Sequence, residues 1–278
     1  MNTLEFTLLI ALGSFAAGFL GSLTGLGGGV VIVPLLTLVF HVDIRYAIGA
    51  SLVSVIATSS GAAAAYVREG YSNIRIGMFL EIATTLGALA GALVAGILSA
   101  SVIAVIFGLV LLYSAYLANR PKSESTSEGP PDRLATLFRM DGDYPTANGR
   151  QSYHVRGIPG GFSLMFLAGV LSGLLGIGSG AVKVLAMDQI MRLPFKVSTT
   201  TSNFMIGVTA AASAGIYLSR GYIDPGLVMP VMLGVLGGSL LGARVLARAD
   251  TRILRVVFGV VIILLGVDMI FNGLTGRF

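Results

Sequence analysis

The composition of the chain excludes an ordinary water-soluble protein. Of its 278 residues, 55% are hydrophobic and 11% are charged, whereas a soluble domain contains about 25% charged residues. Too few polar side chains remain to cover a water-facing surface, so we expect the chain to lie in a lipid bilayer. The absence of cysteine excludes disulfides, thiolate catalysis and cysteine-ligated metals. The cations behind the net charge of +5 lie in short loops, where membrane topology rather than nucleic acid explains them.

A duplication organises the whole chain. When the sequence is shifted by 151 residues, Gly18 aligns with Gly169 and Ser51 with Ser202, without a gap between them. Both halves are apolar over most of their length, so we interpret them as two membrane repeats. Duplicated membrane proteins commonly bind a substrate between their repeats, on interrupted helices, and the duplication therefore indicates transport.

Each repeat is predicted to contain five apolar segments. Repeat 1 (residues 1–119) has them at 4–26, 29–40, 47–67, 76–98 and 101–119, and repeat 2 (residues 161–278) at 161–175, 180–191, 198–218, 227–247 and 253–272. The last three of each repeat approach the roughly 20 residues that a spanning helix needs, but the second is too short to cross. It follows a glycine-rich break, so the first two segments are predicted to form a helical hairpin interrupted inside the protein.

The repeats are joined by a linker of different composition, residues 120–160. The stretch Pro121–Asp132 is rich in Ser, Glu and Pro, and charges of both signs continue to Arg156. We expect a solvent-exposed linker, with a short helix over Leu134–Met140.

The distribution of cations predicts the orientation. Inverted repeats place fourteen of the 18 lysine and arginine residues, six of them in the linker, on one side of the membrane. Parallel repeats would divide the cations far more evenly. Because cations accumulate on the cytoplasmic side, we predict an all-α polytopic protein of the inner membrane with two inverted repeats, each a glycine-interrupted hairpin plus three transmembrane helices. Its linker is then cytoplasmic and both termini lie outside.

The two glycine-rich breaks are candidate anion sites. Glycine allows backbone N–H groups to turn toward a ligand at positive φ, and the N-terminus of the helix that follows favours an anion. The candidate residues are Gly27, Gly28 and Gly29 in repeat 1, and Gly178, Ser179 and Gly180 in repeat 2. Alternatively, these glycines serve only close helix packing.

Lys183 supplies a positive charge near the second break. It lies three residues beyond Gly180, where repeat 1 has Ile32. A lysine inside a membrane is costly and normally has a partner or a function, so we interpret it as a substrate-binding residue. The alternative is that its ammonium extends to the membrane surface.

Hydroxyl and amide side chains open the third segments of both repeats. Ser51, Thr201, Ser202 and Asn203 could donate hydrogen bonds to an oxyanion. The alternatives for such residues are helix capping or hydrogen bonds between helices.

Three acidic residues lie in apolar segments. Glu81 is a candidate for carrying a coupling proton, or else for pairing with an arginine of a neighbouring helix. Asp188 could pair with Lys183 or Arg192, and Asp268 lies near the end of the last helix.

An enzyme is not expected. The two histidines, His41 and His154, are in loops away from the shared motifs, and acidic residues and histidines at metal-ligand spacing do not occur. We therefore predict no catalytic site, no metal and no cofactor.

At the level of motifs, the chain resembles the TauE/SafE family, also called TSUP. The first half carries Gly18-x-x-x-Ser22-x-x-Gly25-x-Gly27-Gly28-Gly29, Pro34 and Ala47-x-Gly49-x-Ser51-Leu52, and the second half carries Gly173-x-x-Gly176-x-Gly178-x-Gly180 and Thr201-Ser-Asn-Phe-Met-Ile-Gly-Val-Thr-Ala-Ala211. The resemblance covers both repeats. It implies a polytopic inner-membrane permease for which sulfite, sulfoacetate and related anions are proposed substrates. Where the family commonly has Thr, this chain has Ala50, which implies a weaker hydroxyl site in repeat 1.

Together these features predict a secondary transporter that exports a small oxyanion, such as sulfite or an organosulfonate, by alternating access. An anion channel is the first alternative, because the same motifs could line a pore. The second is a non-transporting membrane scaffold with a regulatory cytoplasmic linker. The expected partners are the oxyanion and the bilayer, not nucleic acid. The identity of the anion, the direction, the coupling ion and any homo-oligomer stay open.

Overall fold

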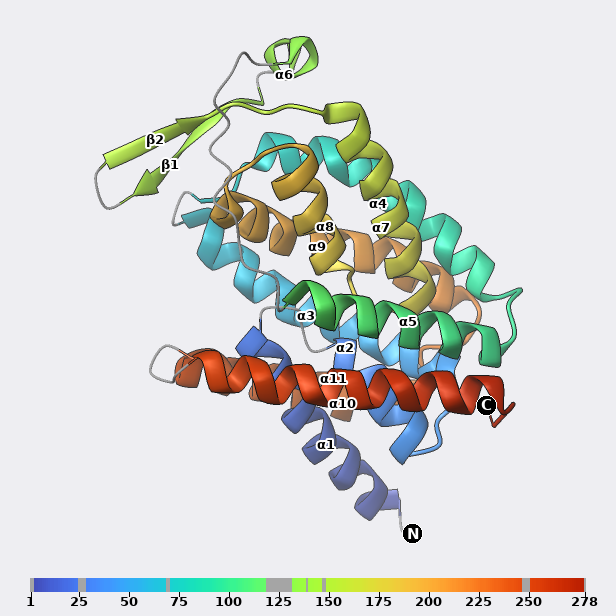
Figure 1. Cartoon of the computed structure of the whole chain (residues 1–278). Coiled ribbons are helices and arrows are strands. Elements are labelled where there is room, and N and C mark those ends of the chain that lie inside the picture. The colour runs from blue at the N-terminus through green and yellow to red at the C-terminus, as the bar shows by residue number, and fades with distance from the viewer. Residues whose placement is uncertain are drawn as a thin grey trace.

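The computed structural model describes residues 3–24, 29–68, 71–118, 132–138, 140–146, 149–246 and 251–277. Over these ranges the regular structure is helical apart from one two-stranded hairpin (Figure 1). Gly27 and Gly28, two of the predicted anion-binding residues, lie outside the described residues.

The helices repeat in the order that the sequence duplication predicts. Repeat 1 contains α1 (Thr3–Thr24), α2 (Gly29–Pro34), the π-helical turn η1 (Leu35–Val39), α3 (Ile44–Arg68), α4 (Ile74–Ala95) and α5 (Ala100–Ala118). Repeat 2 contains α7 (Ile158–Leu175), α8 (Gly180–Leu185), η2 (Ala186–Ile190), α9 (Phe195–Ser219), α10 (Pro225–Leu246) and α11 (Thr251–Leu274). From α2 onward, every element begins 151 residues before its counterpart in repeat 2.

The break between α7 and α8 depends on left-handed backbone conformations. Gly176 ends α7 at φ +69°, Gly178 follows at +70°, and Ser179 precedes α8 at +45°. Glycine adopts this region without the steric cost that a side chain adds, so the two glycines permit the reversal. The helix–break–helix geometry that the sequence predicts is therefore present in repeat 2. The corresponding break of repeat 1, at residues 25–28, lies outside the described residues.

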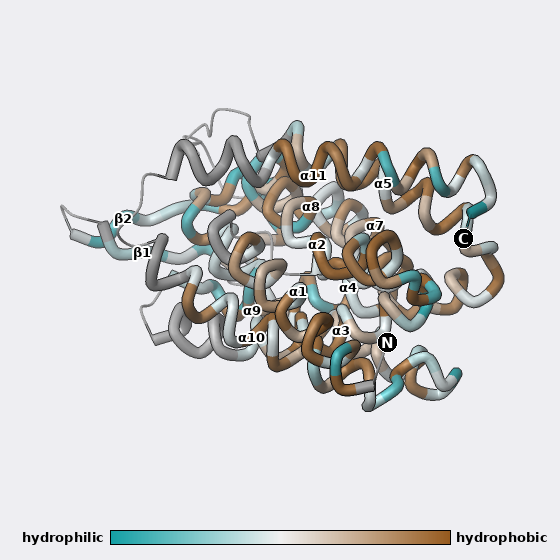
Figure 2. Tube along the Cα trace, turned by 90° about the horizontal axis from the view of Figure 1, so that it is seen from below, coloured by the Kyte–Doolittle hydropathy of each residue, from teal (hydrophilic) through white to brown (hydrophobic). Residues whose placement is uncertain are grey.

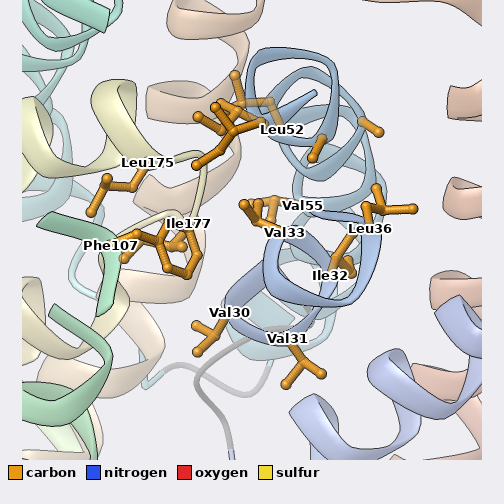
Figure 3. Packing of buried hydrophobic residues seen from close by; sticks show 14 of the residues in the cluster. Val30, Val31, Ile32, Val33, Leu36, Leu52, Val55, Phe107, Leu175 and Ile177 are labelled. Carbon is orange, nitrogen blue, oxygen red and sulfur yellow. The ribbon is translucent and has the colours of Figure 1, made fainter. Parts of the chain in front are cut away.

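The short helix α2 is enclosed by protein. All six of its residues are buried, and they pack against α3 and side chains from other helices. Figure 3 shows this cluster around α2, with labels on Val30, Val31, Ile32, Val33, Leu36, Leu52, Val55, Phe107, Leu175 and Ile177. An interrupted helix is tolerated in a membrane only where protein or water, rather than lipid, surrounds it, and this packing meets that condition.

The two repeats pack against each other through their long helices. α1 packs along α10, and α7 packs along α4, so the first α-helix of each repeat lies against the fourth α-helix of the other. In the second pair, a β carbon at Gly87, Gly91, Gly169 or Gly173 would meet a backbone carbonyl oxygen of the facing helix. Glycine at these positions allows the helix backbones to touch, as in other closely packed membrane helices.

α5 and α11 are counterparts in the duplication, and they pack against each other in opposite directions. Gly108 of α5 faces Gly266 of α11, whereas Gly273 of α11 faces Ser101 near the start of α5. Figure 1 shows the pair side by side, α5 in green and α11 in red.

The outer surface of the helices is apolar, as a bilayer requires. Within the described residues, four helices are long and apolar enough to cross a membrane: Leu4–Gly21, Ile74–Ala95, Ile158–Leu175 and Pro225–Gly242. Large hydrophobic side chains such as Leu12, Ile82 and Leu264 are exposed on them and on α11, and Figure 2 shows hydrophobic residues along most helices. The chain is therefore an all-α, multi-pass membrane protein.

The linker is more buried than its composition suggests. It contains α6 (Arg133–Leu137), shorter than the predicted 134–140 helix, and the antiparallel strands β1 (Gly142–Thr146) and β2 (Gly149–Tyr153), which project at the end of the molecule away from the C-terminus (Figures 1 and 2). Met140, Tyr153 and Val155 are buried in a cluster with residues of α4, α7, η2 and α9. These apolar side chains gain more from contact with the helices than from exposure to water.

Asn73, between α3 and α4, ties this linker to both repeats. Its side-chain amide donates to the Met140 carbonyl (3.0 Å) and to the Tyr153 hydroxyl (2.7 Å), and its backbone N–H donates to the Thr201 hydroxyl of α9 (3.0 Å). The side-chain oxygen Oδ1 of Asn73 also caps α4 by accepting from the Ile76 N–H. Burial raises the pKa of Tyr153 to about 12, so its hydroxyl stays protonated at physiological pH.

Candidate functional site

A buried chain of polar groups joins three helices. The Lys183 ammonium on α8 donates to the Thr209 hydroxyl on α9 at 2.6 Å, and that hydroxyl lies 2.8 Å from Oε1 of Glu81 on α4. Lys183 is 0% exposed and Glu81 is 9% exposed. The structure therefore brings together the buried cation and the buried acid that the sequence singles out, with Thr209 between them.

The surroundings of Glu81 leave one of its oxygens available. Oε1 accepts from the Thr85 hydroxyl at 3.2 Å as well as from Thr209. Oε2 is buried and has no hydrogen-bond partner among the described residues. A buried carboxylate oxygen without a donor is costly, so Oε2 is a position where a proton or a ligand donor would be stabilised.

Burial and hydrogen bonding distinguish between the alternatives for Lys183 and Glu81. Lys183 does not extend to the membrane surface, because its side chain is completely buried. Its ammonium donates to Thr209, and Glu81 is linked through Thr209 to this lysine.

One face of α9 aligns this chain with the glycine-rich break. Ser202, Ile206 and Thr209 follow one another at helical spacing on α9. Ser202 bonds the Gly180 carbonyl, and Ile206 lies beside Gly178 and Gly180. Thr209 accepts from Lys183. The start of α8 and the Lys183 ammonium therefore lie along the same stripe of α9. The break and the buried charge belong to one region of the protein.

Ser51 and Ser202 make the same contact in the two repeats. Ser202 donates to the Gly180 carbonyl at 3.3 Å, and Ser51 lies 3.4 Å from the Gly29 carbonyl, while it also donates to the Gly176 carbonyl at 2.7 Å. Both hydroxyls thus hold the third helix of a repeat against the start of a short helix. Ser51 also connects repeat 1 to the break of repeat 2.

The remaining predicted residues lie in different environments. Ser179 is buried, and its hydroxyl donates to the Ala168 carbonyl of α7, which stabilises the break itself. Thr201 accepts from the Asn73 N–H at the end of the helix bundle that contacts the linker (the linker end), away from Lys183. Asn203 is half-buried on α9, and Asp268 is exposed and accepts from Asn272.

Thr209 lies within the motif from Thr201 to Ala211 but is not among the site residues predicted from the sequence. Its partner under the 151-residue shift is Thr58, so the duplication carries a threonine at this position in both repeats. Thr58 bonds only carbonyls of its own helix among the described residues, whereas Thr209 reaches two other helices. The repeated threonine is a signal that could have identified the position, although not its partners.

The arrangement offers charge and hydrogen-bond donors rather than metal ligands. Among the described residues, no group of three or more His, Asp or Glu side chains could hold a metal ion. A buried ammonium, a buried carboxylate and hydroxyl groups beside an interrupted helix can bind a small polar ion and exchange a proton.

Comparisons with known proteins agree with a membrane transporter. Residues 10–269 match the family model described as "Sulfite exporter TauE/SafE". The chain is similar to "Probable membrane transporter protein YunE" of Bacillus subtilis (strain 168), with 29% identity over 98% of this chain and 99% of that protein. It is also similar to "Probable membrane transporter protein YdhB" of the same organism, with 28% identity over 85% of this chain and 89% of that protein.

A third relative is also described as a probable membrane transporter. "Probable membrane transporter protein MJ0441" of Methanocaldococcus jannaschii is 24% identical over 95% of this chain and 94% of that protein. No solved structure matches the chain significantly. Because the family model covers nearly all of both repeats, the chain belongs to the sulfite exporter TauE/SafE family.

Proposed function

We propose that the protein is a secondary transporter that exports a small oxyanion, such as sulfite or an organosulfonate, across the inner membrane by alternating access. The observation that carries this proposal is the fully buried Lys183 ammonium beside the break between α7 and α8. A buried cation at an interrupted helix is a typical position for an anionic substrate group in transporters built from repeats.

The same region supplies the hydrogen bonds that an oxyanion needs. The backbone of Gly178 and Gly180 lies beside Ile206 and Ser202 of α9, and the start of α8 adds the partial positive charge of a helix N-terminus. In the proposal, Ser51 and Ser202 contribute hydroxyls, and Gly27, Gly28, Gly29, Ser179, Thr201 and Asn203 complete the set predicted from the sequence.

Alternating access is proposed to use the repeats as inverted halves. The counterpart helices α5 and α11 run antiparallel, which is the relation that a two-fold axis in the membrane plane would produce. The cation distribution then favours a cytoplasmic linker with both termini outside.

The test is flux of radiolabelled sulfite and of a small sulfonate in proteoliposomes, for wild type and Lys183→Ala. Loss of the ammonium removes a charged hydrogen bond of about 1.5–3 kcal/mol, so we expect a rise in KM of roughly 10–100-fold. Lys196→Ala is the matched control, because Lys196 is exposed and lies over the Tyr71 ring at 5.5 Å, at the linker end.

The outcomes separate the candidate functions. Saturable flux that responds to an imposed gradient and is weakened only by Lys183→Ala supports the carrier. Flux that rises linearly with anion concentration would indicate a channel. Well-folded wild-type protein that carries neither anion would contradict the proposal and favour a different substrate class or a non-transporting scaffold.

A further inference from the structure

We infer that Thr209 is a positioning residue that links anion binding at Lys183 to protonation of Glu81, so that one proton is taken up with each anion bound. This inference rests on the proposed function, because it assigns the coupling of the same site. It follows from the order of the three groups across α8, α9 and α4.

The two charges meet through a hydroxyl. Among the described residues, no direct ion pair joins Lys183 and Glu81. Thr209 Oγ1 lies 2.6 Å from the ammonium nitrogen and 2.8 Å from the carboxylate oxygen. The ammonium donates to the hydroxyl oxygen, so the single hydroxyl hydrogen is left for another acceptor.

The hydroxyl hydrogen of Thr209 has two possible acceptors. Besides Glu81 Oε1, the Met205 carbonyl of α9 lies 2.9 Å from Thr209 Oγ1. The hydroxyl points to Glu81 when the carboxylate is charged, and it is free to turn to Met205 when Glu81 is neutral. Thr209 therefore has two hydrogen-bonded states that report the protonation of Glu81 to Lys183.

The other charged side chains near Glu81 and Lys183 are few. Lys183 is the one ionisable side chain of α8, α7 has none, and Lys196 of α9 is exposed at the linker end. Asp188 lies on η2, half-buried, and Arg75 lies exposed in the first turn of α4. Arg220, directly after α9, donates to the Ala92 and Leu93 carbonyls of α4 and is exposed. Lys183 is fully buried and is linked to Glu81 through Thr209, so we assign to it the positive charge that balances Glu81.

Binding of an anion changes the net charge of this buried site. Lys183 then faces two negative charges in a buried site, the anion and the Glu81 carboxylate, and like charges that share a site favour protonation of one of them. The proton adds to Glu81, where Oε2 has no partner among the described residues. For a monoanion, the site gains one negative charge and one proton, so its net charge is unchanged.

The experiment measures proton uptake directly. A sulfonate whose charge is constant with pH is titrated into detergent-purified protein by calorimetry, in buffers of different ionisation enthalpy. We expect uptake of about one proton per anion and, at high pH, a tenfold loss of affinity for each further pH unit.

The variants assign that proton. Glu81→Gln should bind the sulfonate with no proton uptake and no such pH dependence. Thr209→Val should bind with reduced uptake, and Thr209→Ser, which keeps the hydroxyl, should restore it. Thr200→Val is the matched control, because Thr200 is a buried threonine of α9 whose hydroxyl bonds carbonyls of its own helix.

The inference and the proposed function fail in different ways. Saturable binding and flux by wild type without proton uptake would overturn the inference and leave the transporter standing. Undiminished uptake in Glu81→Gln, or in Thr209→Val, would also overturn it. If wild type neither binds nor transports the sulfonate or sulfite, both the proposed function and the inference are contradicted. Anion binding by wild type without proton uptake would overturn the inference even if Glu81→Gln does not fold, and Thr209→Val and Thr209→Ser would still test the role of Thr209.

Discussion

Single glycines decide how closely the long helices approach. Gly173 of α7 lies against α4 so tightly that a β carbon would collide with the Ala88 carbonyl oxygen and the Ala92 nitrogen. Backbone atoms cannot yield as a flexible side chain can. By contrast, a β carbon at Gly215 of α9 would meet no atom within 4 Å among the described residues.

Replacing glycine by alanine should therefore have opposite effects at Gly173 and Gly215. Gly173→Ala should destabilise the protein by about 1–3 kcal/mol, the usual cost of overpacking. Gly215→Ala should be neutral or stabilise by up to about 1 kcal/mol, because alanine favours helix. The check is the temperature at which the gel-filtration peak of each detergent-purified variant is lost. Equal transition temperatures would contradict the close α4–α7 contact.

At the scale of elements, the docked linker is the feature that bears most on function. The Tyr153 hydroxyl and the Met140 carbonyl hold the Asn73 amide, and Asn73 also binds Thr201 of repeat 2. The linker therefore contacts both repeats at one end of the bundle. Deleting residues 121–156 would also expose the apolar cluster beneath it, so loss of transport in that deletion would not by itself demonstrate regulation.

A smaller change tests the docking. Tyr153→Phe leaves one Asn73 donor without its partner, a cost of about 1–2 kcal/mol, so we expect tryptic cleavage at Arg150 to become roughly tenfold faster. Tyr144→Phe, which removes an exposed hydroxyl bonded to Gln151 within the hairpin, should change cleavage little. Equal cleavage rates in the two variants would show that Asn73 does not hold the linker in place.

At the scale of the whole molecule, the antiparallel α5 and α11 suggest opposite orientations of the two repeats. The absence of cysteine allows this to be tested with single cysteine substitutions in an otherwise unreactive chain. Gln151 in β2 and Thr275 after α11 are both exposed.

Inverted repeats place these two positions on opposite sides of the membrane. We expect Thr275→Cys to react with a membrane-impermeant maleimide in intact cells, and Gln151→Cys to react only after the membrane is permeabilised. Ser219→Cys, at the exposed end of α9, should behave like Thr275→Cys. Labelling of Gln151→Cys and Thr275→Cys under the same conditions would instead support parallel repeats.

The sequence was sufficient to predict the membrane class, the duplication, the order of the helices and the break between α7 and α8. These properties are local: apolar length sets a spanning helix, and glycine permits a left-handed turn wherever it occurs. The burial of Lys183 was also predictable, because a lone lysine in an apolar segment of a membrane protein seldom faces lipid.

Which side chains meet depends on how the helices pack in three dimensions. Thr209 is 26 residues from Lys183 and 128 from Glu81. From the sequence, Asp188 could pair with Lys183 or Arg192, and Glu81 with an arginine of a neighbouring helix. The choice depends on which faces of α4, α8 and α9 turn toward one another, and packing of helices across the two repeats fixes those faces. The linker is a second example. Its polar composition predicts exposure to water, but Met140, Tyr153 and Val155 are buried because α4 and η2 offer them an apolar surface.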